Sequence, residues 1–393
     1  MQEQEQEQEQ EQEQEQESGL VKLMKSFAEM PDPRVVGRTD HLLLDILVLT
    51  ICAVLCGVDD WEGVEIWGKA KLEWLRQFIA LKNGVPSHDT IGRVFAAMDS
   101  AKFQACFIGW VCGVCGSLVG QVVAVDGKTQ RGSHHHRLGK KAIHMVSAFA
   151  SAQGIALGQL KTAEKSNEIT AIPQLLKLLS IKGSIVTIDS MGCQTGIAKV
   201  IVEQEADYVL ALKGNHGKLH EQVREFFKVA EQYEYRALDA QPDATCEKDH
   251  GRIESRRVVA LSSAHLEQVG AWQGLKSMIM VESVREIGEK RTSEKRFYLS
   301  SLAPDSKQIG DAIRAHWGIE NKLHWCLDVT YKEDACRTRT GHAAENFNTV
   351  RKITLNLLRQ NKSIKRSIAK KRMYAGLHEH YLAEVLGLRP LVI

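Results

Sequence analysis

The 393-residue sequence lacks any apolar run long enough to cross a membrane. Its best candidate, residues 42–57, contains Asp45 and is shorter than the roughly 20 residues that a membrane-spanning helix needs. The sequence does not open with a basic flank and an apolar stretch, so we expect no secretory signal peptide. Nine cysteines, an odd and scattered set, argue against a secreted disulfide scaffold. We therefore expect a cytoplasmic protein without membrane association.

An excess of charge of one sign is also missing, because 51 basic residues face 49 acidic ones and leave a net charge of +2. That value hides an uneven distribution. Residues 2–17 are a Gln-Glu repeat with eight glutamates and no basic residue, so the remainder has 51 basic and 41 acidic residues, a net +10. The repeat has no apolar residue to bury, and we expect residues 1–18 to be disordered. The basic body suits a partner that carries phosphates.

Residues 19–118 have the pattern of a helical domain. Residues 41–57 predict a helix buried on most sides, and residues 61–78 predict a second helix rich in tryptophan. A third helix is predicted to begin near Pro86, with Ser87 or Asp89 as its N-cap. That short helix contains Arg93 and follows a turn, which is compatible with a DNA-reading helix-turn-helix, but the pattern favours ordinary packing in a bundle.

Residues 119–215 change to an alternation of strands and helices. Strands are predicted at 121–125, 142–150, 154–161, 184–188 and 207–212, with helices at 168–179 and 192–203. The first three strands can form an antiparallel meander, and helical crossovers can add the other two. The prediction is an α/β fold with a mixed five-stranded sheet.

The rest of the chain divides into three predicted segments. Residues 216–303 read as a β-rich insertion subdomain, residues 304–340 as a core helix, and residues 341–393 as a basic helical region suited to nonspecific contacts with the DNA backbone. In the insertion, Arg252, Glu254, Arg256 and Arg257 alternate as on a strand. They fit either phosphate contacts or cross-strand ion pairs.

Two predicted strands end in an aspartate: the first at Asp126 and the fourth at Asp189. If these strands are neighbours, the two carboxylates converge and favour a shared proton or a divalent metal. Magnesium takes a few carboxylates together with water and phosphate oxygens, and two ions about 4 Å apart can clamp the reacting oxygens of a phosphodiester.

A third acid is expected from the helix that follows the insertion. On an α-helix, Trp317, Glu320, His324 and Leu327 would share one face, which sets Glu320 among apolar groups. The alternative is a salt bridge from Glu320 to Arg314 or Lys322. Asp328 and Asp334 are rival third acids.

Together these features resemble the DDE transposases, whose catalytic core has a ribonuclease H-like fold. The resemblance is closest to insertion-sequence transposases of the ISAs type, including the H-repeat-associated proteins. It extends from about residue 24 to near the end of the sequence. The matching stretches are residues 40–47, 125–133 (VDGKTQRGS), 164–173 (EKSNEITAIP), 187–194 (TIDSMGCQ), 212–215, 250–254 (HGRIE) and 316–328 (HWGIENKLHWCLD).

The resemblance implies magnesium-dependent cleavage of double-stranded DNA at the terminal inverted repeats of an insertion sequence, followed by strand transfer into target DNA. Asp126, Asp189 and Glu320 take the catalytic and metal-binding positions, with two Mg²⁺ ions that Mn²⁺ could replace. A homodimer on DNA and association with the nucleoid are expected. The DNA-binding candidates from the residues themselves are Lys128, Arg131, Lys213, Asn215, Arg252, Arg256, Arg314, His316 and Lys322.

One departure concerns the surroundings of the third acid. Wider relatives often have Tyr, Arg and Lys seven before, four before and seven after the glutamate, where this sequence has Ile313, His316 and Leu327. Which groups grip the phosphate therefore stays open. Two other functions also fit the sequence: a catalytically silent, repeat-associated DNA-binding protein, and a structure-selective DNA nuclease on the same fold.

Overall fold

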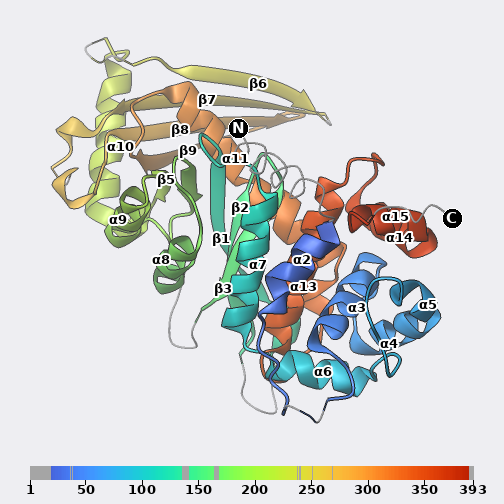
Figure 1. Cartoon of the computed structure of the whole chain (residues 1–393). Helices are drawn as coiled ribbons and strands as arrows, with labels where there is room; N and C mark the ends of the chain where they lie inside the picture. The colour runs from blue at the N-terminus through green and yellow to red at the C-terminus, as the bar shows by residue number, and fades with distance from the viewer. Residues whose placement is uncertain are drawn as a thin grey trace, which may run out of the picture. The chain divides into compact units, whose positions relative to one another are not determined.

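The computed structural model describes residues 19–35, 37, 39–134, 141–162, 168–236, 238, 240–249, 251–267 and 269–388 (Figure 1). The Gln-Glu repeat, with its predicted disorder, lies outside these residues. The chain divides into two compact units. The first comprises residues 1–115, 129–143 and 324–393, and the second comprises residues 116–128 and 144–323. The predicted N-terminal helical domain and basic C-terminal region thus belong to one unit.

The first unit is helical. Its α-helices are α2 (Gly19–Ala28), α3 (Leu43–Leu55), α4 (Trp61–Ala70), α5 (Leu72–Leu75), α6 (His88–Ala97), α7 (Ser100–Val114), α12 (Trp325–Val329), α13 (Ala343–Gln360), α14 (Ile368–Leu377) and α15 (Glu379–Val385). Helix α3 is buried along almost its whole length, as its apolar sequence predicts. The helix predicted over residues 61–78 is instead broken at Lys71, between α4 and α5. None of the described helices is long and apolar enough to span a membrane.

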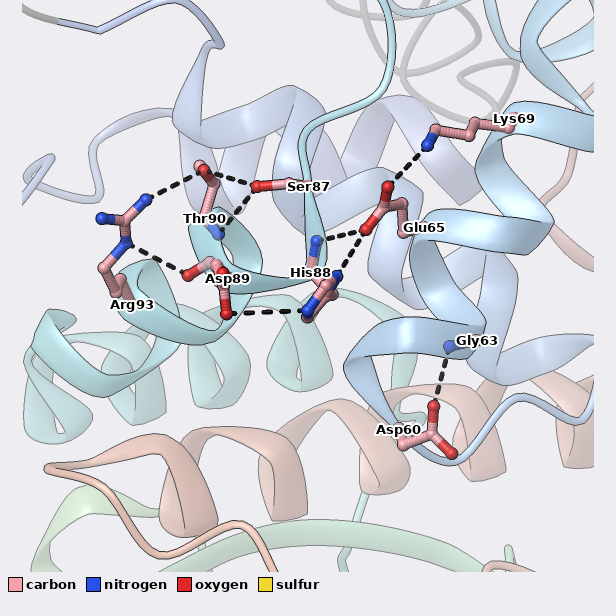
Figure 2. A network of polar contacts seen from close by, with 9 residues as sticks. All are labelled: Asp60, Gly63, Glu65, Lys69, Ser87, His88, Asp89, Thr90 and Arg93. Carbon is pink, nitrogen blue, oxygen red and sulfur yellow. Dashed lines mark hydrogen bonds and ion pairs between the residues drawn. The ribbon is translucent and has the colours of Figure 1, made fainter.

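The start of α6 distinguishes between the two predicted caps. Ser87 is the N-cap, and its Oγ accepts a hydrogen bond from the Thr90 N–H at 3.3 Å, while Asp89 lies in the first turn (Figure 2). Arg93 folds back onto its own helix, where Nε donates to the Asp89 carbonyl at 3.2 Å.

Glu65 joins α4 to the start of α6 (Figure 2). One carboxylate oxygen lies 2.7 Å from both the backbone nitrogen and Nδ1 of His88, and the other accepts from Lys69 at 2.6 Å. The Lys69 and His88 hydrogen bonds lower the pKa of Glu65 to about 2. The Glu65 carboxylate in turn raises the pKa of His88.

The second unit is built on one nine-stranded mixed sheet with the order β3-β2-β1-β4-β5-β9-β8-β7-β6. Its strands are β1 (Val122–Gln130), β2 (Ile143–Ala150), β3 (Ile155–Lys161), β4 (Ile185–Ile188), β5 (Asp207–Leu212), β6 (Asp243–Asp249), β7 (Arg252–Ser262), β8 (Ser277–Ile287) and β9 (Lys290–Ser300). The predicted hairpin of β2 and β3 is antiparallel, and β4 pairs in parallel with both β1 and β5.

The prediction of a five-stranded sheet with a separate β insertion was wrong in one respect: the insertion continues the sheet. Strand β9 pairs antiparallel with β5, from Val209 opposite Ser300 to Leu212 opposite Phe297, and β8, β7 and β6 follow (Figure 1). The second half of β7 is apolar and buried, so it belongs to the core, whereas its first half carries the charged cluster. This amphipathic division lets one long strand serve both regions.

The described residues of the second unit form four α-helices: α8 (Glu168–Leu178), α9 (Thr195–Glu203), α10 (Gly217–Gln232) and α11 (Ser306–His316). Asp305 is the N-cap of helix α11, and its side chain accepts from the Gln308 N–H at 2.9 Å. Its apolar face, with Ile309 and Ile313, packs in one core cluster with Ile185 of β4 and Val258 of β7. This packing fixes the end of α11, and the segment after it, on the sheet.

Candidate active site

Asp126 and Asp189 lie next to each other at the edge of the sheet. Strands β1 and β4 are parallel neighbours, and their register ends with Val125 opposite Ile188. Each aspartate is the next residue, and each is partly buried. The prediction that these two strands are neighbours is therefore confirmed, although β1 does not end at Asp126 but continues to Gln130.

The environment of Asp189 disfavours its charged form. Burial is the largest cause that raises its pKa, and the like charges of Glu168 and Asp126 raise it further. Two backbone N–H groups partly offset this, because Met191 and Gly192 donate to Oδ1 at 3.0 and 3.4 Å. The site thus concentrates negative charge that a cation would relieve.

Glu320 lies in a π-helical turn, Ile319–His324, between α11 and α12. The predicted continuous α-helix over this region was wrong, and so was the shared face, because a π turn has a longer repeat than the assumed 3.6 residues. Trp317 and Glu320 are exposed, whereas His324 and Leu327 are buried. Glu320 is consequently a solvent-facing acid on an irregular turn.

All three predicted acids line one hollow of about 400 Å³ in the second unit. Basic and aromatic groups share its wall: Lys213, His220, Lys295, Arg296, His316 and Trp317. The Arg296 guanidinium lies over the Trp317 ring at 5.8 Å from its centroid. Neither rival acid lines this hollow: Asp328 and Asp334 belong to the first unit, where Asp334 contacts Arg131.

The sequence reasoning missed one pair beside these acids. Oε1 of Glu168, at the start of α8, lies 2.7 Å from Nε2 of His144 on β2. Glu168 is only 9% exposed, and its charge acts on Asp189. Glu168 belongs to the matching stretch of residues 164–173. From the sequence alone, however, it looks like an ordinary acidic residue in the first turn of an exposed helix.

The donor set suits a hard divalent cation. Magnesium usually binds one or two protein carboxylates and completes its shell with water and substrate phosphate. Asp126 and Asp189 supply that pair, and their mutual repulsion is the chemistry that a cation would offset. Within the described part of the chain, no three His, Cys, Asp or Glu side chains are grouped so as to hold a metal ion by themselves.

The predicted DNA-binding residues separate into groups. Lys213 and His316 line the hollow with the acids, and Nδ1 of His316 lies 3.0 Å from the Thr187 hydroxyl. Asn215 donates to the Ser190 carbonyl at 2.8 Å, next to Asp189. These three residues surround the end of β4.

A second hollow, of about 770 Å³, holds three other candidates. Arg256, Arg314 and Lys322 line it, together with Trp317. Arg314 is paired with Glu247 of β6, and Lys322 donates to the Ser151 carbonyl at 3.4 Å. Arg314, one of the two salt-bridge partners predicted for Glu320, is thus paired with Glu247.

The remaining candidates lie outside both hollows. Arg252 is 3.2 Å from Glu254 on the same strand, and Glu254 also lies 3.4 Å from Arg285 across the β7–β8 pair, so this cluster contains one cross-strand ion pair. Lys128 is a half-buried residue of β1. The Arg131 N–H donates to Asp334 at 3.1 Å, and the Arg131 side chain is 85% exposed.

Two residues of the basic C-terminal region are structural. Lys371 and Arg372 are buried and not available to DNA. Lys371 donates to the carbonyls of Leu358 and Asn361, at the C-terminal end of α13. In contrast, Lys362, Lys365, Arg366 and Lys370 are exposed.

Comparison with known proteins adds a family match to this geometry. Residues 117–357 match the family model described as a transposase DDE domain, and residues 24–111 match the model described as DDE_Tnp_1-associated. "Putative transposase YncI" of Escherichia coli O157:H7 is 44% identical over 93% of this chain and 94% of its own length. "H repeat-associated putative transposase YhhI" of Escherichia coli K12 is 42% identical over 94% of this chain and 98% of its own length.

Among solved structures, the piggyBac transposase synaptic complex with hairpin DNA aligns with a TM-score of 0.42 and 11% identity. The alignment covers 95% of this chain and 80% of that chain. A likeness at that level does not bear on the fold or the chemistry of this site.

Proposed function

The chain belongs to the transposase DDE domain family, and from that premise we propose that it cleaves DNA at the ends of its insertion sequence and transfers the strands to target DNA. The family match supports transposition as the process. We propose the individual steps, the metal and the roles of the residues described below. Its substrates are the double-stranded terminal inverted repeats of the element and a target duplex.

One observation supports the proposal above the others. Asp126 and Asp189 follow the last register pair of two parallel strands, and Glu320 reaches the same hollow from the π turn. Three acids from distant parts of the sequence thus line one hollow, in which burial and like charge disfavour the ionised form of Asp189. Such a cluster of carboxylates does not stabilise the folded protein, which favours a functional role for it.

The residues take distinct roles in the proposed reaction. Asp126 and Asp189 would hold the divalent cations, with Glu320 as the third acid. Bound there, magnesium ions supply activation of the attacking oxygen and stabilisation of the leaving oxygen. Lys213 and His316 orient the scissile phosphate from the wall of the hollow. His316 stands where wider relatives have arginine, and its bond with Thr187 fixes the imidazole.

The test is an end-cleavage and strand-transfer assay with Mg²⁺ on oligonucleotides that carry the inverted repeats of the element. Wild-type protein is compared with Asp189→Asn and Glu320→Gln, which keep the side-chain shape and remove the charge. Glu203→Gln, on the exposed end of α9, is the matched control. We expect cleavage by the wild type and by the control, and none by the two active-site variants.

Two outcomes would replace the proposal by its alternatives. Tight binding of cognate ends without any cleavage in Mg²⁺ or Mn²⁺ would identify a silent DNA-binding protein. Equal cleavage of branched DNA that lacks end sequences would identify a structure-selective nuclease. Because transposition joins two ends, we also propose a homodimer on DNA, which sedimentation of the protein–end complex would test.

A further inference from the structure

Gly127, the residue after Asp126, has no room for a side chain. A methyl group there would overlap the carboxylate of Glu168 and would stand 2.5 Å from Nε2 of His144. The φ angle of Gly127 does not require glycine, since only glycines with positive φ have that need and Gly127 is not among them. Close approach of the Glu168–His144 pair to the backbone is therefore what demands glycine at this position.

The pair is built from two separate elements. His144 lies on β2, the strand next to β1 in the sheet, and Glu168 is the first residue of α8. The 2.7 Å contact between Nε2 of His144 and Oε1 of Glu168 fixes the carboxylate, and Glu168 is only 9% exposed. A buried carboxylate is costly to fold unless it is paired, and His144 provides that partner.

The position of the pair links it to Asp126. Gly127, where a methyl group would overlap the Glu168 carboxylate, directly follows Asp126 on β1. The Glu168 carboxylate therefore lies beside the backbone that carries Asp126, and its negative charge would attract a cation held there.

We propose that Glu168 and His144 are a positioning pair of the active site. Glu168 braces the backbone beside Asp126 and adds a third negative charge that draws the divalent cation, while His144 orients that carboxylate. This inference rests on the proposed function. Its direct consequence is a change in cation affinity, which can be measured without DNA.

The experiment measures Mn²⁺ binding by the full-length protein, from the electron paramagnetic resonance signal of free Mn²⁺. Glu168→Gln removes the charge but keeps an oxygen that accepts from His144. His144→Phe removes the hydrogen bond and keeps a ring. Glu203→Gln is again the matched control, because that glutamate is half exposed on α9. Thermal unfolding of each variant without metal establishes that it is folded.

We expect Mn²⁺ affinity to fall about tenfold or more in Glu168→Gln, the scale seen when groups behind metal ligands are changed. A smaller fall is expected in His144→Phe and none in Glu203→Gln. If Glu168→Gln does not fold, Glu168→Asp keeps the charge one methylene further back and should give an intermediate loss. Equal affinity of wild type and the folded Glu168 variant, or no measurable Mn²⁺ binding by wild type, would overturn the proposal.

The two proposals fail separately. Wild type that cleaves cognate ends while Glu168→Gln binds Mn²⁺ as tightly as wild type would leave the proposed function intact and refute the positioning pair. If Glu168→Gln binds Mn²⁺ more weakly than wild type but wild type never cleaves its cognate ends, the positioning pair is supported and the proposed function is refuted.

Discussion

Arg372 offers a sharp test of what the basic C-terminal region does. Its guanidinium lies 2.8 Å from Asp59 and donates to the carbonyls of Val54 and Thr330 at 2.9 and 2.7 Å. It also lies 4.2 Å above the ring centroid of Tyr331. The residue is 4% exposed, so Arg372→Met leaves Asp59 and several carbonyls without this partner. Removing one member of a buried ion pair costs about 3–5 kcal/mol.

For a unit of about 200 residues, each kcal/mol shifts the melting temperature by about 2–4 °C, so we expect a loss of about 6–20 °C. Differential scanning calorimetry measures this shift, and Met373→Ala, at an exposed neighbour, is the control. At a temperature where the variant is folded, the salt dependence of DNA binding should equal that of wild type. Arg366→Met, at an exposed position, should instead lower the log–log salt slope by about 0.9 if it meets a phosphate. A smaller salt slope in Arg372→Met with an unchanged melting temperature would refute this reasoning.

Three further predictions follow from individual contacts. Asp189→Asn should raise the melting temperature in metal-free buffer, because it removes a charge that burial, Glu168 and Asp126 disfavour; a lower melting temperature would contradict this. His88→Ala should cost more stability at pH 5.5 than at pH 9. Because the pKa of His88 is raised in the folded protein, its contribution to stability is complete below about pH 6.5 and is lost as pH rises through the folded-state pKa. Because the pKa of Glu65 is lowered, its contribution is lost only in acid, as pH falls toward about 2. An equal melting-temperature difference at both pH values would count against the His88–Glu65 pair. Gly192→Ala should destabilise by about 1–3 kcal/mol, because its methyl would overlap Ile188 and lie 3.0 Å from Ile172; wild-type stability in urea unfolding would show that the site has room.

The pairing of Asp126 with Asp189 could be predicted because the information is local. Each aspartate ends a short apolar run, and helical crossovers between parallel strands bring equivalent strand ends to one edge of the sheet. The register of β1 with β4 then makes the two residues neighbours. The N-cap at Ser87 was within reach for a similar reason, since capping depends on a few consecutive residues.

The continuity of the sheet could not be predicted in the same way. Strand β9 joins β5 through residues about 90 positions apart, such as Val209 and Ser300. A strand at the edge of a five-stranded core and a strand inside a larger sheet have the same alternation, so periodicity does not distinguish them. The burial of Lys371 and Arg372 was not predicted for a related reason. The sequence does not distinguish a basic residue that donates to a distant carbonyl from one that faces solvent.

Glu320 shows how one irregular turn changes the interpretation of a spacing. An uninterrupted α-helix would put Glu320 on one face with His324 and Leu327, which are buried, and would bury an acid with them. The π turn, Ile319–His324, changes the phase between these residues, so that Glu320 opens toward the hollow while His324 and Leu327 stay buried. Single π turns within α-helices are rare and are found frequently at functional sites. The irregularity that made the helix prediction wrong therefore argues for Glu320, rather than a regular helical acid, as the third member of the site.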